Sequence, residues 1–245
     1  MHLKEPADPS TGTTASTVTT TIPPKDATTT TSVTEINHKY PRPLYFAFGS
    51  NLSSTQMRIR CTHDPELSSK PMAIARLDGW RWFICEAGYA NVLPPPELRV
   101  GRQETDGDAV PISGEEDTVY GILYEMSPED EFLLDGYEDV DHGASASKSK
   151  KVPTGIRPRE QGKGDYNKWY FPAIVTKWLD GDGDEDGDKV QTTLIYIDEE
   201  RVRVGPPREE YIGRMNRAIR EAEMLGFPKA WAEDVMRRFI PDAEG

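Results

Sequence analysis

The stretch Leu44-Tyr45-Phe46-Ala47-Phe48-Gly49-Ser50-Asn51-Leu52 decides how this chain folds. Four of the first five side chains are large and apolar, so residues 44–48 are predicted to form a short buried strand. Gly49, Ser50 and Asn51 are typical turn residues and end that strand in a tight loop. Backbone N–H groups in such a loop can hold an anionic group, although a plain turn explains the pattern equally well.

Further strands are expected where β-branched and aromatic residues concentrate, in residues 73–85, 118–126, 169–179 and 191–197. A short helix is predicted from the N-cap Ser127 to Gly136, with Pro128 at its first position. Residues 207–240 carry an apolar stripe and predict two helices interrupted at 226–228. Together these elements predict an α+β fold, a small curved β-barrel or sheet with flanking C-terminal helices.

The composition divides the chain into two parts. Residues 1–38 are dominated by Thr, Ser and Pro, have few large apolar side chains, and are expected to be a disordered tail. Residues 39–245 are expected to form one domain. Three hydrophilic stretches, near 101–117, 141–167 and 180–188, are predicted to be surface insertions, with poor order over much of the middle one.

The charge and the cysteines exclude several classes of protein. A net charge of -13 argues against a nucleic-acid partner, because phosphate binding depends on clustered Lys and Arg. No apolar run approaches the roughly 20 residues needed to cross a bilayer, and no secretory signal is visible. We therefore expect no membrane association and a cytoplasmic location. Cys61 and Cys85 lack the spacing of a metal site and are predicted to be reduced, partly buried thiols.

Two ordered motifs resemble the γ-glutamyl cyclotransferase family. The segment 45–52 is similar to the family's opening strand and loop. The segment Leu134-Asp135-Gly136-Tyr137-Glu138-Asp139-Val140 is similar to the family's Leu-Asp-x-x-Glu-Gly-Val, which follows a later strand and a short helix. The resemblance implies a compact β-barrel with flanking helices, a cavity at one end, and Glu138 as the group that transfers protons.

The resemblance also implies the substrate-binding residues, which lie in the first motif and at the start of the C-terminal helices. They are Tyr45, Phe46, Ala47, Phe48, Gly49, Ser50, Asn51 and Tyr211. This chain departs from the family pattern twice, with Phe48 in place of the usual Tyr and Asp139 in place of the usual Gly. Without the resemblance, Glu138 would be interpreted as one of several solvated acidic residues. Tyr211 would be interpreted as a residue that packs its helix on the sheet.

The implied reaction releases 5-oxoproline and a free amine from a small γ-glutamyl substrate. The α-amine must lose a proton while it attacks its own γ-carbonyl, and one carboxylate can take that proton and deliver it to the departing amine. No metal or other cofactor is expected. Two alternatives stay open: a related enzyme that acts on γ-glutamyl amines of the γ-glutamyl-lysine type, and a non-catalytic binding module on the same fold.

The acidic stretch at 182–187 does not fit a complete calcium loop. Asp182 to Gly187 matches the first half of such a loop, but its twelfth position would be Thr193, where a bidentate Glu is required. The flanking segments are predicted strands rather than helices. The stretch is therefore predicted to be a solvated hairpin tip.

Overall fold

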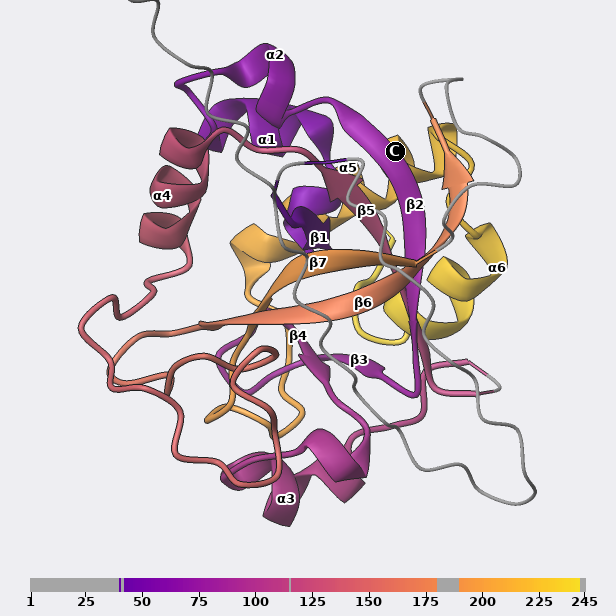
Figure 1. The fold of residues 1–245 in the computed structure, drawn as a ribbon. Coiled ribbons are helices and arrows are strands. Elements are labelled where there is room, and N and C mark those ends of the chain that lie inside the picture. The colour runs from indigo at the N-terminus through magenta and orange to yellow at the C-terminus, as the bar shows by residue number, and fades with distance from the viewer. Residues whose placement is uncertain (1–39, 41, 115, 180–189, 243–245) are drawn as a thin grey trace, which may run out of the picture. The chain divides into compact units, whose positions relative to one another are not determined.

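A closed five-stranded barrel begins with the motif at residue 44 and forms the centre of the fold (Figure 1). The computed structural model describes residues 40, 42–114, 116–179 and 190–242. In order around the barrel, the strands are β1 (Leu44–Ala47), β5 (Thr118–Tyr124), β2 (Pro71–Asp78), β6 (Asn167–Trp178) and β7 (Val190–Ile197). Strand β1 pairs antiparallel with β5 and parallel with β7, which closes the barrel. The predicted α+β class with a small barrel is confirmed.

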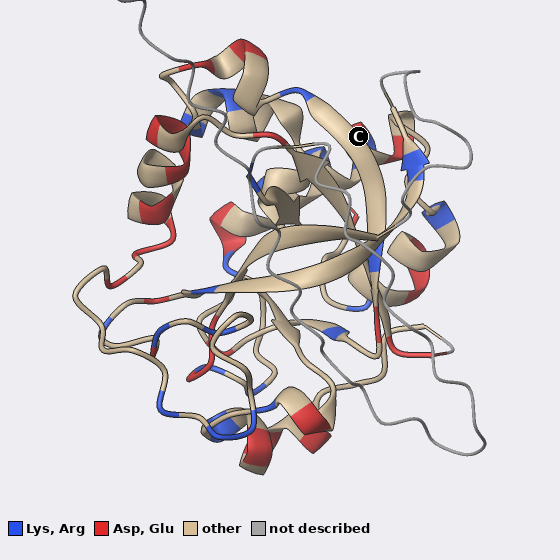
Figure 2. Ribbon diagram, in the orientation of Figure 1, with Lys and Arg blue, Asp and Glu red and all other residues tan. Residues whose placement is uncertain are grey.

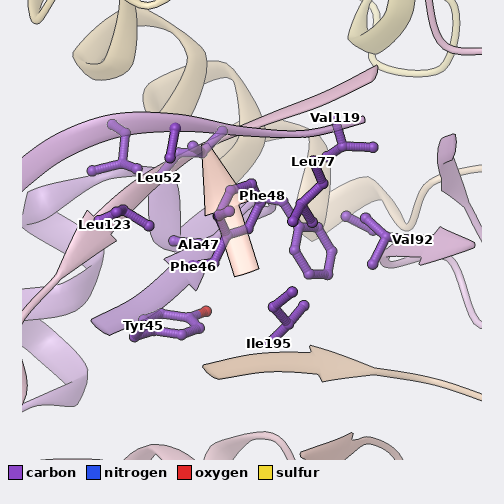
Figure 3. Packing of buried hydrophobic residues seen from close by; sticks show 14 of the residues in the cluster. Tyr45, Phe46, Ala47, Phe48, Leu52, Leu77, Val92, Val119, Leu123 and Ile195 are labelled. Atoms are coloured by element: carbon purple, nitrogen blue, oxygen red, sulfur yellow. The ribbon is translucent and has the colours of Figure 1, made fainter. Parts of the chain in front are cut away.

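The first motif supplies the core of the barrel. All four residues of β1 are buried, and Phe46 and Ala47 have no exposed surface. Phe46, Ala47 and Phe48 lie among the aliphatic side chains of other strands (Figure 3). The ring of Phe46 lies so close to β5 that a Cβ at Gly121 would be 2.5 Å from it, so only glycine fits there. Apolar burial of this kind is the main term that stabilises a fold.

The segment 73–85 is not the single strand that its composition predicts. Strand β2 ends at Asp78, and the chain turns at Gly79, whose φ of 81° favours glycine. It continues as β3 (Arg81–Ile84), which pairs with β4 (Ala90–Leu93) in a separate two-stranded sheet. Trp80 lies in the turn and is fully buried. Because the Trp80 side chain is large and aromatic, the apolar run in the sequence continues through the turn, which suggested an uninterrupted strand.

Helices flank the barrel (Figure 1). Strand β1 leads through a 3₁₀ turn (Ser50–Leu52) into α1 (Ser54–Arg60) and α2 (Pro65–Ser68), neither of which the sequence predicted. Helix α4 (Pro128–Tyr137) starts at the predicted N-cap Ser127 but continues past Gly136. The C-terminal helices are α5 (Glu209–Met224) and α6 (Lys229–Trp231), followed by a π-helical turn (Ala232–Met236). They are interrupted at Gly226, as predicted.

The first two hydrophilic stretches are folded against the rest of the chain. Residues 101–117 contain α3 (Arg102–Asp106), which is preceded by a 3₁₀ turn (Pro96–Leu98) and followed by another (Gly107–Ala109). Residues 141–166 have no regular helix or strand in the described chain, yet Arg157 pairs with Glu199 at 2.6 Å, and each side chain is less than 5% exposed. This buried ion pair joins the stretch to the residues that follow β7, and the expected poor order over much of 141–167 stays a prediction.

Several predictions fall outside the described residues, namely the disordered tail at 1–38, the insertion at 180–188 and the solvated hairpin tip within it. The strands that flank this tip, β6 and β7, pair antiparallel as predicted. Both cysteines are free, as predicted, and they are fully rather than partly buried. No helix in the described ranges is both long and apolar enough to cross a bilayer.

Candidate active site

The loop after β1 is held against the start of α5 by one hydroxyl. The Tyr211 hydroxyl accepts hydrogen bonds from the backbone N–H groups of Ser50 and Ala90, each at 3.3 Å. A Cβ at Gly49 would lie 2.9 Å from this hydroxyl and 3.2 Å from the Ala90 Cβ. Gly49 is therefore required by close approach, and its absent side chain lets Tyr211 reach the loop.

Glu138 is placed by the way α4 ends. It is the C-cap residue, and the next residue, Asp139, takes a left-handed conformation with φ 48°. The Val140 N–H donates to the Asp135 carbonyl at 2.9 Å, which is the bond that typically closes a helix of this type. The family's usual Gly at position 139 suits that conformation, and Asp is among the few other residues that tolerate it. The turn directs Glu138 back toward the barrel.

Glu138 follows helix α4, which carries acidic residues along its length (Figure 2). The Glu129 side chain is 58% exposed, whereas that of Glu138 is 14% exposed. Asp135 is buried, but its carboxylate accepts hydrogen bonds from the Tyr196 hydroxyl at 2.6 Å and from Lys168 at 3.1 Å. Asp135 therefore ties the end of α4 to the barrel.

The Glu138 carboxylate uses one oxygen for its protein contacts. Its Oε1 accepts hydrogen bonds from Arg60 at 2.7 Å and from the Asn51 side-chain amide at 3.3 Å. Within the described residues, no hydrogen bond reaches Oε2. Burial raises the pKa of Glu138 above its ordinary value, and the charge and hydrogen bond of Arg60 and the hydrogen bond of Asn51 oppose part of that rise. The carboxylate is thus held firmly at one oxygen and is open at the other.

Glu138 and the first-motif loop line one cavity of about 250 Å³. The cavity wall brings together most of the predicted site residues: Tyr45, Phe48, Gly49, Ser50, Asn51, Glu138 and Tyr211. Phe46 and Ala47 are not on this wall. They are fully buried in the core of the barrel, because alternate residues of a strand face opposite sides and this strand is covered on both. Their predicted contact with substrate is not supported.

Eight of the described residues on the cavity wall were not predicted from the sequence. They are Arg60, Tyr89, Ala90, Tyr137, Asp165, Tyr166, Tyr196 and Arg214. Asp165 and Tyr166 end the hydrophilic stretch that was predicted to be only a surface insertion. The Asp165 N–H donates to the Asp139 carbonyl at 3.0 Å, which brings the end of this stretch beside Glu138. An aromatic residue, Tyr166, among polar neighbours was the signal in the sequence that this end of the stretch could contribute to a site.

The two departures from the family pattern occupy different positions relative to the cavity. Phe48 lies on its wall, and its carbonyl accepts a hydrogen bond from the Trp82 indole at 2.9 Å. The hydroxyl of the family's usual Tyr is therefore absent at this position of the wall. Asp139 is exposed and does not line the cavity. It is also not among the main causes of the raised pKa of Glu138.

The cavity offers complementary polar groups. The Asn51 Oδ1 atom is buried and has no hydrogen-bond partner in the described chain, so it is an acceptor available to a ligand. Burial raises the pKa of Tyr211 to about 12, so its hydroxyl stays protonated at neutral pH. The Tyr211 hydroxyl is the acceptor in both of its hydrogen bonds, so its own proton is available to donate. The cavity can therefore bind a cationic group at Asn51 Oδ1 and an acceptor oxygen at the Tyr211 hydroxyl.

Comparisons by sequence find no match. No family model matches the chain, and no curated protein matches it. Among solved structures, YkqA from Bacillus subtilis matches 86% of this chain with a TM-score of 0.52 and 15% identity. The fold of this protein is similar to that of YkqA. The chain spans 58% of the length of YkqA.

Two further solved structures share the likeness with lower TM-scores. An uncharacterized protein from Homo sapiens, LOC79017, has a TM-score of 0.49 and 19% identity over 82% of this chain and 89% of its own. A yeast γ-glutamyl cyclotransferase specific to glutathione has a TM-score of 0.40 and 12% identity over 83% of this chain and 99% of its own. At such identities the likeness concerns the fold, and the activity has to be argued from the cavity.

Proposed function

We propose that this protein is a γ-glutamyl cyclotransferase, which converts a γ-glutamyl amino acid or dipeptide into 5-oxoproline and the free amine. One observation carries the proposal: the largely buried Glu138 carboxylate and the Gly49–Asn51 loop share the wall of one small cavity. The resemblance of the two sequence motifs points to the same reaction. A cytoplasmic location stays a prediction from the sequence.

The α-ammonium of the substrate fits beside Glu138. Oε2 of the carboxylate and the unpartnered Oδ1 of Asn51 both accept hydrogen bonds, and an ammonium group has three to donate. Burial raises the pKa of Glu138 toward that of an α-amine, which favours proton transfer between them. Glu138 takes one ammonium proton and leaves a neutral amine with a lone pair.

Ring closure then moves two protons from the attacking nitrogen to the departing one. The amine nitrogen attacks the γ-carbonyl carbon, the new C–N bond closes a five-membered ring, and the bond to the amine half breaks as Glu138 returns the first proton to the departing nitrogen. The ring nitrogen gives its second proton to the Glu138 carboxylate, which passes it to the released amine, so the carboxylate is regenerated and no water is consumed. The Tyr211 hydroxyl can donate to the carbonyl oxygen as negative charge develops there. Holding the substrate folded supplies much of the rate, because the reaction is intramolecular.

The proposal is tested by measuring 5-oxoproline released by the purified chain from a panel of γ-glutamyl dipeptides and γ-glutamyl amines. We expect turnover, and we expect Glu138→Gln to lower kcat/KM by at least about 100-fold, since general acid–base catalysis contributes on that order. Glu129→Gln is the matched control, because Glu129 lies on the same helix with its side chain 58% exposed.

Absence of 5-oxoproline from every member of the panel would refute the proposed enzyme and favour a binding module. Turnover that survives Glu138→Gln would refute the assigned mechanism while leaving the reaction class intact. Circular dichroism of both variants shows whether the fold is retained. The glutamine can still accept from Arg60, so we expect Glu138→Gln to fold normally.

A further inference from the structure

Arg214 of α5 is a second cation on the wall of the Glu138 cavity. Its guanidinium carbon lies 5.0 Å from the ring centroid of Tyr211 and 5.9 Å from that of Tyr89, so the two aromatic faces orient it. In the described chain its Nε is buried without a hydrogen-bond partner. A buried donor without a partner is costly, and a ligand that accepts from it would remove that cost.

The two arginines of the cavity differ in how well they are neutralised. Arg60 pairs with Glu138 at 2.7 Å, and both side chains are at most 14% exposed. Arg214 pairs with Glu210 at 3.2 Å, and the Glu210 side chain is 56% exposed. Glu210 is also shared, because it accepts a hydrogen bond from the Tyr89 hydroxyl at 3.0 Å. Exposed ion pairs contribute little, so Arg214 keeps both charge and donors for an anion.

Arg214 also lies in a more exposed part of the cavity than Glu138. Its side chain is 27% exposed, against 14% for Glu138 and 12% for Arg60. The γ-glutamyl amine must reach Glu138 and Asn51, so that half of the substrate occupies the buried part. The amine half then extends toward the exposed part, where Tyr89 and Arg214 lie. An arginine between two aromatic rings is suited to a planar carboxylate there.

We propose, resting on the γ-glutamyl cyclotransferase function proposed above, that Arg214 binds a carboxylate on the amine half of the substrate and so determines specificity. The enzyme then prefers γ-glutamyl amino acids and peptides, which carry that carboxylate, to γ-glutamyl amines, which lack it. Tyr89 and Tyr211 position the guanidinium. Arg214 makes no hydrogen bond to Glu138 in the described chain, but its charge lowers the pKa of Glu138, by less than that of Arg60 does. The variants are therefore compared at a pH above the acid limb of the profile.

The test compares γ-glutamylalanine with γ-glutamylethylamine, which differs from it by a hydrogen in place of the alanine carboxylate. The wild-type chain is expected to show a kcat/KM about 10- to 100-fold higher for γ-glutamylalanine, as a hydrogen bond to a charged group implies. Arg214→Gln should lower kcat/KM for γ-glutamylalanine by about the same factor, mainly through KM. It should lower that for γ-glutamylethylamine by less than about threefold, so that the preference is lost.

Two further variants make the result specific. Arg220→Gln removes the same charge from an exposed position of α5 and should leave the preference unchanged. Arg214→Lys retains a charge and should restore part of the preference. Equal losses on both substrates in Arg214→Gln, or no preference in the wild-type chain, would overturn the assignment. No 5-oxoproline from either substrate in the wild-type chain would instead refute the proposed function, and the assignment with it.

Discussion

Arg60 donates a hydrogen bond to Glu138 over 2.7 Å, although the two residues are 78 positions apart in the chain. Arg60 ends α1, which follows the first motif, and Glu138 ends α4, which follows strand β5. The guanidinium also lies 5.0 Å from the centroid of the Tyr137 ring. These contacts hold Oε1 of Glu138 in place and leave Oε2 toward the cavity, so Arg60 is a positioning residue for the proposed base.

Replacing Arg60 is expected to change the pH dependence of catalysis. Burial raises the pKa of Glu138, and Arg60 lowers it, so Arg60→Gln should raise that pKa further. Glu138 must be deprotonated in the free enzyme to accept a proton. The acid limb of the kcat/KM profile should therefore move to higher pH, with the largest loss of activity on the acid side and recovery as the pH rises. The measurement is kcat/KM from about pH 5 to 10.

Arg58→Gln is the control for this profile, since Arg58 belongs to the same helix but pairs with the exposed Glu66 at 2.7 Å. Its acid limb should coincide with that of the wild-type chain. A loss in Arg60→Gln that is equal at every pH would show that Arg60 only supports the fold. A shift of the acid limb to lower pH would contradict the electrostatic argument itself.

The close approach of Gly49 and Tyr211 gives a prediction that a double-mutant cycle can test. In Gly49→Ala the new Cβ meets the Tyr211 hydroxyl, so the hydroxyl must move away from the Ser50 and Ala90 N–H groups. We expect a loss of about 1–3 kcal/mol in the free energy of unfolding and at least a tenfold fall in kcat/KM.

Tyr211→Phe removes the hydroxyl that the Cβ would meet, while the 3.2 Å contact with Ala90 is present in both backgrounds. Gly49→Ala should therefore destabilise the Tyr211→Phe chain less than the wild-type chain, with a coupling of at least about 0.5 kcal/mol. Chemical denaturation of the wild-type chain, the two single variants and the double variant measures the coupling. Additive effects would show that the loop and Tyr211 are not in contact as described.

The sequence predicted the barrel well because its strongest signals are local. Residues 44–48 are apolar whatever surrounds them, and Ser127-Pro128 is a helix start by itself. The turn at Gly79 was missed because the aromatic Trp80 continues the apolar run. Helix α1 was missed for the opposite reason, since the sequence STQMRIR buries only Gln56 and Met57 and shows little apolar periodicity.

The candidate site was predicted only in part, because its remaining residues depend on contacts between distant segments. A resemblance of motifs identifies Glu138, but nothing local in the sequence pairs it with Arg60. Asp165 and Tyr166 end a hydrophilic stretch whose place depends on the buried pair between Arg157 and Glu199. These two residues are 42 positions apart, and no periodic pattern in the sequence indicates that they form a pair.

Asp139 provides the last prediction, because its backbone and its charge can be tested separately. A residue that has a Cβ is strained at a φ of 48°. Asp139→Gly should therefore raise the free energy of unfolding by up to about 1 kcal/mol. Asp139→Asn removes the charge but keeps a residue that tolerates this conformation, and it should change the free energy of unfolding by less than about 0.5 kcal/mol. Thermal and chemical unfolding of both variants measure these effects.

The same two variants decide whether the charge of Asp139 acts on catalysis. Asp139 is exposed, and it is not among the main causes of the raised pKa of Glu138, so neither variant should move the acid limb of kcat/KM. An acid limb at lower pH in both variants would show that the carboxylate of Asp139 raises the pKa of Glu138 after all. A shift in Asp139→Gly alone would trace the effect to the backbone at the end of α4, which positions Glu138.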